Sequence, residues 1–344
     1  MTEKGTWPKW LLFVFLPSVM ALLFTTGILI WAGAPPMEAY SHMLRGAFGS
    51  ADKWAAVFVA WVPLLLCGIG LSFTFTAGLW NIGIEGQMVM GAIGATWVVR
   101  TFDLPGPLLI PSAILSSIVA GALWSLLAGI LRTYGKVHEI FTGLGLNFVA
   151  AGTTNFLIFG PWKQPGTATM SGTELFGLSA WLPKFGGLAI GPVEIGIAAS
   201  AIVVAAFALR GTMFGLRLRA VGRNPRAAYL MGLKTERNLL LAFGTAGALA
   251  GIAGGVQAMG LFHRLIPSIS SGYGYLAILV VLLTGNRVLW ITPVAFFFAA
   301  ASKGSLQLPL EMHLDSSLGG VLQAILVLFV ILARGLAQVL GRRK

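Results

Sequence analysis

The stretch LLIPSAILSSIVAGALWSLLAGIL, residues 108–131, runs for 24 positions without a charged residue. As an α-helix that rises about 1.5 Å per residue, it would cross the roughly 30 Å hydrocarbon core of a bilayer. Six more stretches have the same apolar character, at residues 10–31, 54–73, 140–159, 188–209, 239–261 and 318–340. Together they predict an all-α protein with several membrane-spanning helices.

The composition of the whole chain agrees with this prediction. Its 344 residues are 57% hydrophobic and 10% charged, with a mean hydropathy of +0.85, too apolar for a soluble domain that needs a polar surface. The single cysteine, Cys67, excludes an internal disulfide and argues against a cysteine metal site. The net charge of +12 is more typical of orientation signals beside membrane helices than of nucleic-acid binding.

Three shorter apolar stretches bring the predicted number of segments to ten. They lie at residues 87–99, 273–283 and 288–301, and each could cross the membrane or re-enter it. With the N-terminus in the cytoplasm, 16 of the 23 Lys and Arg residues fall on the cytoplasmic side and 7 outside. This excess predicts that both termini are cytoplasmic, in a bacterial-type inner membrane.

The ten segments divide into two halves within one transmembrane domain that spans residues 1–344. The first half covers about 10–160 and the second about 188–340, and a short segment stands third in each. Short segments at corresponding places are typical of inverted repeats and of the substrate route in transporters. The alternative is that Gly-interrupted segments simply reflect the frequency of Gly in membrane helices.

Polar side chains that could line such a route precede and begin the segment at 87–99. They are Asn81, Glu85 and Gln87, in the Gly-rich sequence NIGIEGQ (81–87). A carboxylate within the hydrocarbon is costly unless it is paired or hydrated, so Glu85 would mark a watered route or a solute site. Alternatively, Glu85 caps the first turn of the helix that follows.

A second polar group, KVHEIFTGLGLN (136–147), contributes Thr142 and Asn147 to neighbouring parts of one helix face. His138 and Glu139 come before the apolar run, where a lone His is more often a headgroup-level residue than a metal ligand. Since no second His or Cys has metal-ligand spacing, we expect no metal site.

The longest internal hydrophilic segment, residues 210–237, contains a short helix with its own start and stop signals. Asn224 is a good N-cap, Pro225 suits the first helical position, and Gly232 suits the end. Arg219, Arg223 and Arg226 surround it, so the segment is interpreted as a docking element or, alternatively, as a solvated loop at the lipid headgroups.

The sequence lacks the motifs expected of an ATPase, a proton-driven carrier or a membrane enzyme. No Gly-x-x-x-x-Gly-Lys-Ser/Thr sequence occurs, so a P-loop ATPase site is not expected. Few intramembrane acids or histidines are available for a proton relay, which weakens the hypothesis of an ion-driven carrier. A membrane enzyme would need Glu85, Glu139 and His138 to converge on one site. We therefore expect a transport protein without catalytic residues or a cofactor of its own.

Four stretches resemble the permease subunits of ATP-binding-cassette importers in the branched-chain amino acid, simple sugar and nucleoside group. They are NIGIEGQ (81–87), RAVGRNPRAA (219–228), GALAGIAGG (247–255) and SGYGYLAI (271–278). The first is most similar to the nucleoside branch, which is often labelled as simple-sugar permeases. The stretch 138–147 resembles the family only loosely.

The resemblance implies a permease subunit that passes a small polar solute, in the first place a nucleoside, from an external binding protein. Partner ATPase subunits would bind ATP and Mg²⁺ and dock on a cytoplasmic coupling loop at 210–238, with Arg219, Gly222, Asn224, Pro225 and Arg226 as its contact residues. A second permease subunit would complete the channel, and the nucleoside branch favours a related but different chain. Branched-chain amino acids and simple sugars stay open as alternative solutes.

Overall fold

The computed structural model describes residues 9–164 and 171–312, with 314–315, 318–322, 324–325, 328–329 and 332. Apart from one isolated bridge between Lys163 and Thr173, the described residues form helices and connections. The helices in chain order are α1 (Lys9–Trp31), α2 (Pro36–Phe48), α3 (Ala51–Thr76), α4 (Ile84–Thr101), α5 (Gly106–Thr133), α6 (Glu139–Phe159), η1 (Leu178–Ala180), α7 (Pro192–Gly211), α8 (Met213–Arg223), α9 (Pro225–Leu230), α10 (Thr235–Val256), η2 (Gln257–Phe262), α11 (Tyr273–Thr284), α12 (Val288–Ser305) and α13 (Gln307–Met312).

The prediction of an all-α membrane protein is confirmed. Six described helical stretches are long and apolar enough to cross a bilayer, and the shorter apolar helices are Leu22–Trp31 and α11. The stretch predicted as short at 288–301 belongs to a longer one, because α12 continues through α13 to Met312. Ten crossings and cytoplasmic termini stay predictions, and the segment at 318–340 lies largely outside the described residues.

The chain divides into two compact units. The first contains residues 1–57 and 297–344, and its small core gathers Leu29, Ala39 and Leu308 from α1, α2 and α13. The amphipathic helix α2, in this unit, was not predicted, because its polar and apolar residues are interspersed and form no long apolar run. The second unit, residues 58–296, holds all ten residues predicted for the solute route and the coupling loop.

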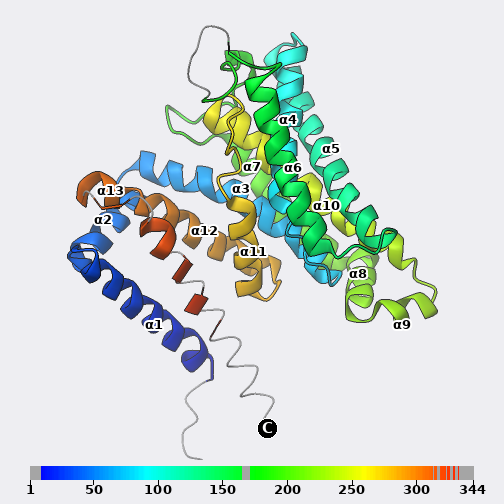
Figure 1. Ribbon diagram of the computed structural model, residues 1–344, viewed down its shortest axis with the longest axis horizontal. Helices are drawn as coiled ribbons and strands as arrows, with labels where there is room; N and C mark the ends of the chain where they lie inside the picture. The colour runs from blue at the N-terminus through cyan, green and yellow to red at the C-terminus, as the bar shows by residue number, and fades with distance from the viewer. Residues whose placement is uncertain are drawn as a thin grey trace, which may run out of the picture. The chain divides into compact units, whose positions relative to one another are not determined.

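Helix α4 forms the centre of the second unit. It is buried along most of its length and packs against α5, α6, α10 and α11, an arrangement that can be followed in Figure 1. Its residues are mostly small or apolar, as expected of a helix surrounded by other helices rather than by lipid.

Glycines let the main chains of α4, α5 and α10 come close together. A Cβ at Gly91 of α4 or Gly121 of α5 would overlap the backbone of Gly251 in α10, and one at Gly254 would overlap the Met88 carbonyl. Between membrane helices, where the hydrophobic effect gives little, small residues gain close van der Waals packing. These three helices therefore form a tightly packed block.

Candidate functional site

The turn between α3 and α4 brings Asn81 and Gln87 together. α3 ends at Thr76, the chain reverses through Gly78 with φ of +77°, and α4 begins at Ile84. Asn81 Nδ2 donates to Gln87 Oε1 at 3.2 Å, and Gln87 Nε2 donates back to Asn81 Oδ1 at 2.9 Å. Both side chains are buried, so each amide satisfies the other within an apolar surrounding.

Glu85 lies in the first turn of α4 and points at the N-terminus of α11. Its Oε1 accepts from Ser270 Oγ at 2.5 Å, and its Oε2 accepts from the Gly274 N–H at 2.7 Å. A helix N-terminus carries a partial positive charge and unpaired N–H groups, which is why a buried carboxylate is tolerated there. The alternative prediction, that Glu85 caps the helix that follows it, is therefore wrong: α4 has no side-chain cap among the described residues, and Glu85 accepts instead from the first turn of α11.

Asn147 of α6 joins the same region. Its Oδ1 accepts from the Gly86 N–H at 2.8 Å, while its Nδ2 donates to the Ile82 carbonyl at 3.0 Å and to the Tyr275 hydroxyl at 3.2 Å. One amide therefore connects α6 with the start of α4 and the start of α11. We call Asn81, Glu85, Gln87, Asn147, Ser270 and Tyr275 the polar cluster.

Thr142, the fifth residue predicted for the solute route, bonds within its own helix. Its hydroxyl donates to the His138 carbonyl at 3.3 Å. His138 is exposed and caps α6, since its Nδ1 accepts from the Ile140 N–H at 3.4 Å. The neighbouring Glu139 carboxylate lies 2.7 Å from Arg132 Nε, an ion pair that the sequence did not single out.

The polar cluster is buried apart from Tyr275, which is 44% exposed, and its members bond to one another and to nearby backbone groups. Ser270 and Tyr275 were not predicted as site residues, although they flank and belong to the Gly-rich stretch 271–278. A buried polar network at the meeting point of α4, α6 and α11 fixes how these helices meet, because breaking any one bond leaves a polar group unpaired. Whether a solute contacts these side chains stays a prediction.

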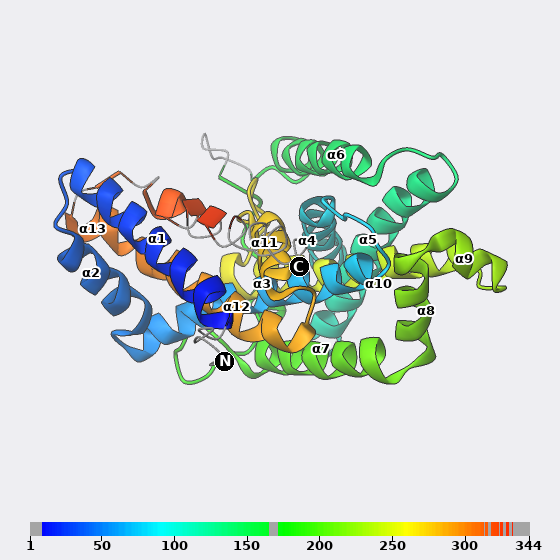
Figure 2. The same cartoon turned by 90° about the horizontal axis from the view of Figure 1, so that it is seen from below.

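The predicted docking helix is present at the expected residues. Asn224 Oδ1 accepts from the Ala227 N–H at 3.0 Å, Pro225 begins α9, and Gly232 follows its end with φ of +81°. Before it, Thr212 caps α8, whose Arg219 guanidinium donates to the Leu209 carbonyl. Figure 2 shows α8 and α9 following α7 at one edge of the second unit.

Gly222 is the point where α8 touches the turn after α3. A Cβ at this position would overlap the Thr76 carbonyl and the main chain near Gly78. The opposite face of the loop is open: Tyr229, Leu230 and Met231 are 67%, 79% and 84% exposed. With Arg223 and Arg226 also exposed, α9 presents an apolar tip surrounded by positive charge. Such a surface suits a protein partner with an apolar groove and acidic rim.

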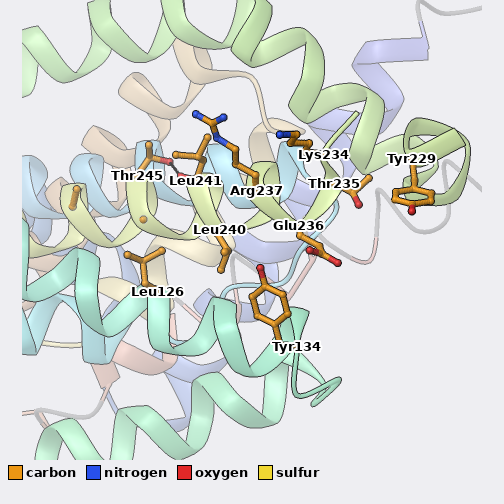
Figure 3. Close-up of a pocket in the computed structure, with 12 residues that line it drawn as sticks. Leu126, Tyr134, Tyr229, Lys234, Thr235, Glu236, Arg237, Leu240, Leu241 and Thr245 are labelled. Carbon is orange, nitrogen blue, oxygen red and sulfur yellow. Dashed lines mark hydrogen bonds between the residues drawn. The ribbon is translucent and has the colours of Figure 1, made fainter. Parts of the chain in front are cut away.

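A cavity of about 770 Å³ lies between α5, α9 and the start of α10. The apolar residues Leu126, Leu240 and Gly244 line it together with the charged residues Lys234 and Glu236 (Figure 3). None of the residues in the polar cluster lines this cavity, so it does not coincide with the predicted solute route.

At the other end of α10, His263 packs in a cluster that the sequence did not reveal. Its ring stacks on Trp181 at 3.8 Å between centroids. Its Nδ1 lies 2.7 Å from the Met259 carbonyl oxygen, which can only accept, so Nδ1 carries the proton and donates. Nε2 is then free to accept from Lys184 Nζ at 3.2 Å. Burial lowers the pKa of His263 below its ordinary value, and the Lys184 charge lowers it further against the opposing effect of the Met259 hydrogen bond.

Comparison with known proteins shows which family this chain resembles. The model of the family described as "Branched-chain amino acid transport system / permease component" matches residues 54–331. The glucose ABC transporter permease protein TsgB13 of Haloferax volcanii is 32% identical, over 96% of this chain and 90% of its own. The guanosine ABC transporter permease protein NupP of Bacillus subtilis is 29% identical over 97% of each chain. A second guanosine permease protein of that organism, NupQ, is 27% identical over 73% of this chain and 81% of its own.

Proposed function

The chain belongs to the permease-component family of branched-chain amino acid transport systems, and on that premise we propose that it carries a nucleoside through the cytoplasmic membrane as one subunit of an ATP-binding-cassette importer. The observation that carries the choice of solute is the similarity to a guanosine permease along 97% of both chains. The sequence NIGIEGQ at the start of α4 supports the same branch.

We propose a topology of ten crossing or re-entrant segments in one permease domain, with both termini in the cytoplasm. The corresponding short helices of the two halves would then be α4 and α11. Their direct contact through Glu85, which accepts from the Gly274 N–H at 2.7 Å, supports the pairing of the two halves around a central route.

The loop from 210 to 238 would couple this chain to ATPase subunits, which bind ATP and Mg²⁺. The support is the exposed apolar tip of α9 and the basic residues around it. Arg219 and Gly222 hold α8 against the ends of α7 and α3, while Asn224 and Pro225 set the start of α9 and Arg226 faces outward. Hydrolysis in the partners would move this loop, and the chain itself would make no covalent bond.

The solute route would pass along the polar cluster and Thr142. Burying polar side chains among apolar helices is costly and is usually associated with function. In the present conformation Asn81 and Gln87 bond to each other, and Asn147 bonds to the backbone and to Tyr275. A solute with several hydroxyl and amide groups could replace these bonds when α4, α6 and α11 move apart, as alternating access requires.

The second permease subunit would be a related but different chain. Bacillus subtilis has two permease proteins named for guanosine, and both are similar to this chain. An external solute-binding protein would deliver the solute. A pull-down from membranes with an affinity tag on this chain would recover a second, non-identical permease if the pairing is heteromeric, and only this chain and the ATPase if it is not.

A sugar is the second candidate solute, favoured by the 32% identity to a glucose permease. The decisive experiment is uptake of radiolabelled guanosine in cells with and without the gene, with excess unlabelled nucleosides, free bases, ribose, glucose or leucine as competitors. Loss of uptake on deletion with competition by nucleosides alone supports the proposal. Competition by glucose or leucine instead would replace the solute, and uptake abolished by an uncoupler while ATP is maintained would indicate an ion-driven carrier.

A further inference from the structure

A second cavity, of about 350 Å³, lies where α3, α7, α8 and α11 end and where α12 begins. Its wall carries four arginines, namely Arg210, Arg219, Arg223 and Arg287. No Asp or Glu is among the described residues that line it. The ion pairs found among the described residues involve Arg132, His42 and His138, and none of these four arginines.

Helix ends explain part of this positive charge. Four helix C-termini border the cavity, those of α3, α7, α8 and α11, each with a partial charge of roughly −0.5, and the N-terminus of α12 contributes roughly +0.5. Arg219 serves such an end directly, because it donates to the Leu209 carbonyl in the last turn of α7. After these contributions a net charge of roughly +2.5 stays without a counter-charge from the described chain.

We propose that this cavity binds a phosphate group, carried either by an anionic phospholipid headgroup or by a soluble phosphate ester. Arginine guanidinium groups match phosphate oxygens with paired hydrogen bonds, and four arginines line this cavity. Basic pockets between membrane helices on the cytoplasmic side are a known way of holding lipid headgroups. The volume of about 350 Å³ lies at the lower end of ordinary ligand pockets, which span roughly 300–1,000 Å³, and suits a headgroup or small ester.

The position gives the bound phosphate a structural effect. Arg223 belongs to α8, which leads directly into α9, whereas Arg287 stands between α11 and α12. A phosphate held by both would tie the loop carrying α9 to the junction of two helices of the same unit. This site lies beyond the proposed function and does not depend on which solute the protein carries.

The test uses the full chain, assembled with its partners, in nanodiscs of phosphatidylcholine with and without phosphatidylglycerol. Native mass spectrometry counts the retained phosphatidylglycerol, and thermal unfolding reports stabilisation. Inorganic phosphate and AMP are titrated in phosphatidylcholine nanodiscs as the soluble arm. The test variant is R210Q/R287Q, since neither side chain donates to a helix carbonyl among the hydrogen bonds found. The matched control is Arg217→Gln, an exposed arginine of α8 that does not line the cavity.

We expect one probe to bind wild type and R217Q alike and to bind R210Q/R287Q about 25-fold more weakly, at about fivefold for each arginine removed. If that probe is phosphatidylglycerol, the site is a lipid site, and if it is inorganic phosphate or AMP, the site serves a soluble ester. Equal binding by all three proteins, or no binding by wild type, would overturn the proposal. So would binding by the permease alone that disappears once the ATPase subunits are assembled, because the cavity would then receive an acidic side chain of the partner.

Discussion

Replacement of Glu85 separates a structural role from a role in transport. Glu85→Ala removes the acceptor of two hydrogen bonds, one of 2.5 Å from Ser270 and one of 2.7 Å from the Gly274 N–H. The serine hydroxyl can turn toward another acceptor, but the Gly274 N–H stands in the first turn of α11 and is left buried. A buried donor without a partner costs about 1–3 kcal/mol, and a hydrogen bond to a charged group contributes about 1.5–3 kcal/mol. Relief of the carboxylate desolvation offsets part of this, so we expect a loss of about 2–4 kcal/mol in the free energy of unfolding.

Glu85→Gln gives the matched comparison. Its amide oxygen can accept from the Gly274 N–H while its amide nitrogen donates to Ser270, so both contacts survive and only the charge is lost. We expect a loss of about 1 kcal/mol. If the carboxylate also serves the solute route, E85Q would fold well and transport poorly. A variant that is both stable and active would show that Glu85 has only the structural role.

The assay is reversible unfolding in mixed micelles, followed by circular dichroism, beside uptake in cells. Glu38→Ala, in which an exposed carboxylate of α2 is removed, is the control and should shift the unfolding free energy by less than about 0.5 kcal/mol. The double-mutant cycle of Glu85→Ala with Ser270→Ala should give a coupling energy of about 1 kcal/mol or more. An unfolding free energy unchanged in E85A would refute the reasoning.

Three further predictions concern other parts of the second unit. Asn224→Ala removes the cap that accepts from the Ala227 N–H, so α9 should lose about 1 kcal/mol of local stability. The ATPase activity stimulated by the solute should fall more than the basal ATPase activity, and an equal fall in both would contradict the coupling role. Gly254→Val forces a side chain against the main chain of α4 and should destabilise the protein by about 1–3 kcal/mol or more, whereas Gly145→Ala, with nothing within 4 Å of the added Cβ, should be neutral or stabilising in the same unfolding assay. Because the pKa of His263 is lowered in the folded protein, its imidazole is protonated first in the unfolded chain as the pH falls below about 6.5. The free energy of unfolding should therefore decline below that pH, and the decline should be smaller in H263Q. Identical pH profiles for wild type and H263Q would show that His263 does not cause the decline.

The sequence predicts best the features that depend on neighbouring residues. The helix at 225–230 follows from a capping Asn, a Pro and a terminating Gly within nine positions, and all three lie where local backbone geometry requires them. Apolar length likewise predicts the long helices. Apolar length does not predict the amphipathic α2, because its polar and apolar residues alternate with helical period.

Contacts between distant residues could not be predicted in the same way. In the sequence Glu85 stands out as an acid among apolar residues, but the neighbouring residues do not identify its partners. These are Ser270 and Gly274, which lie about 185 positions later at the start of α11. The arginines of the second cavity come from α7, α8 and the α11–α12 connection. Only the fold brings them together, so their sequence positions indicate membrane orientation and no binding site.

The contact of Gly222 with the turn at Gly78 has a mechanical consequence. Between α8 and that turn there is main chain on both sides and no side chain that could change rotamer and absorb a displacement. A shift of α8 would therefore pass as a push on the peptide backbone only three residues before Asn81. Because this junction is stiff, a movement of α8 at the edge of the unit and a loosening of the polar cluster in its interior would occur together, with no series of side-chain adjustments between them.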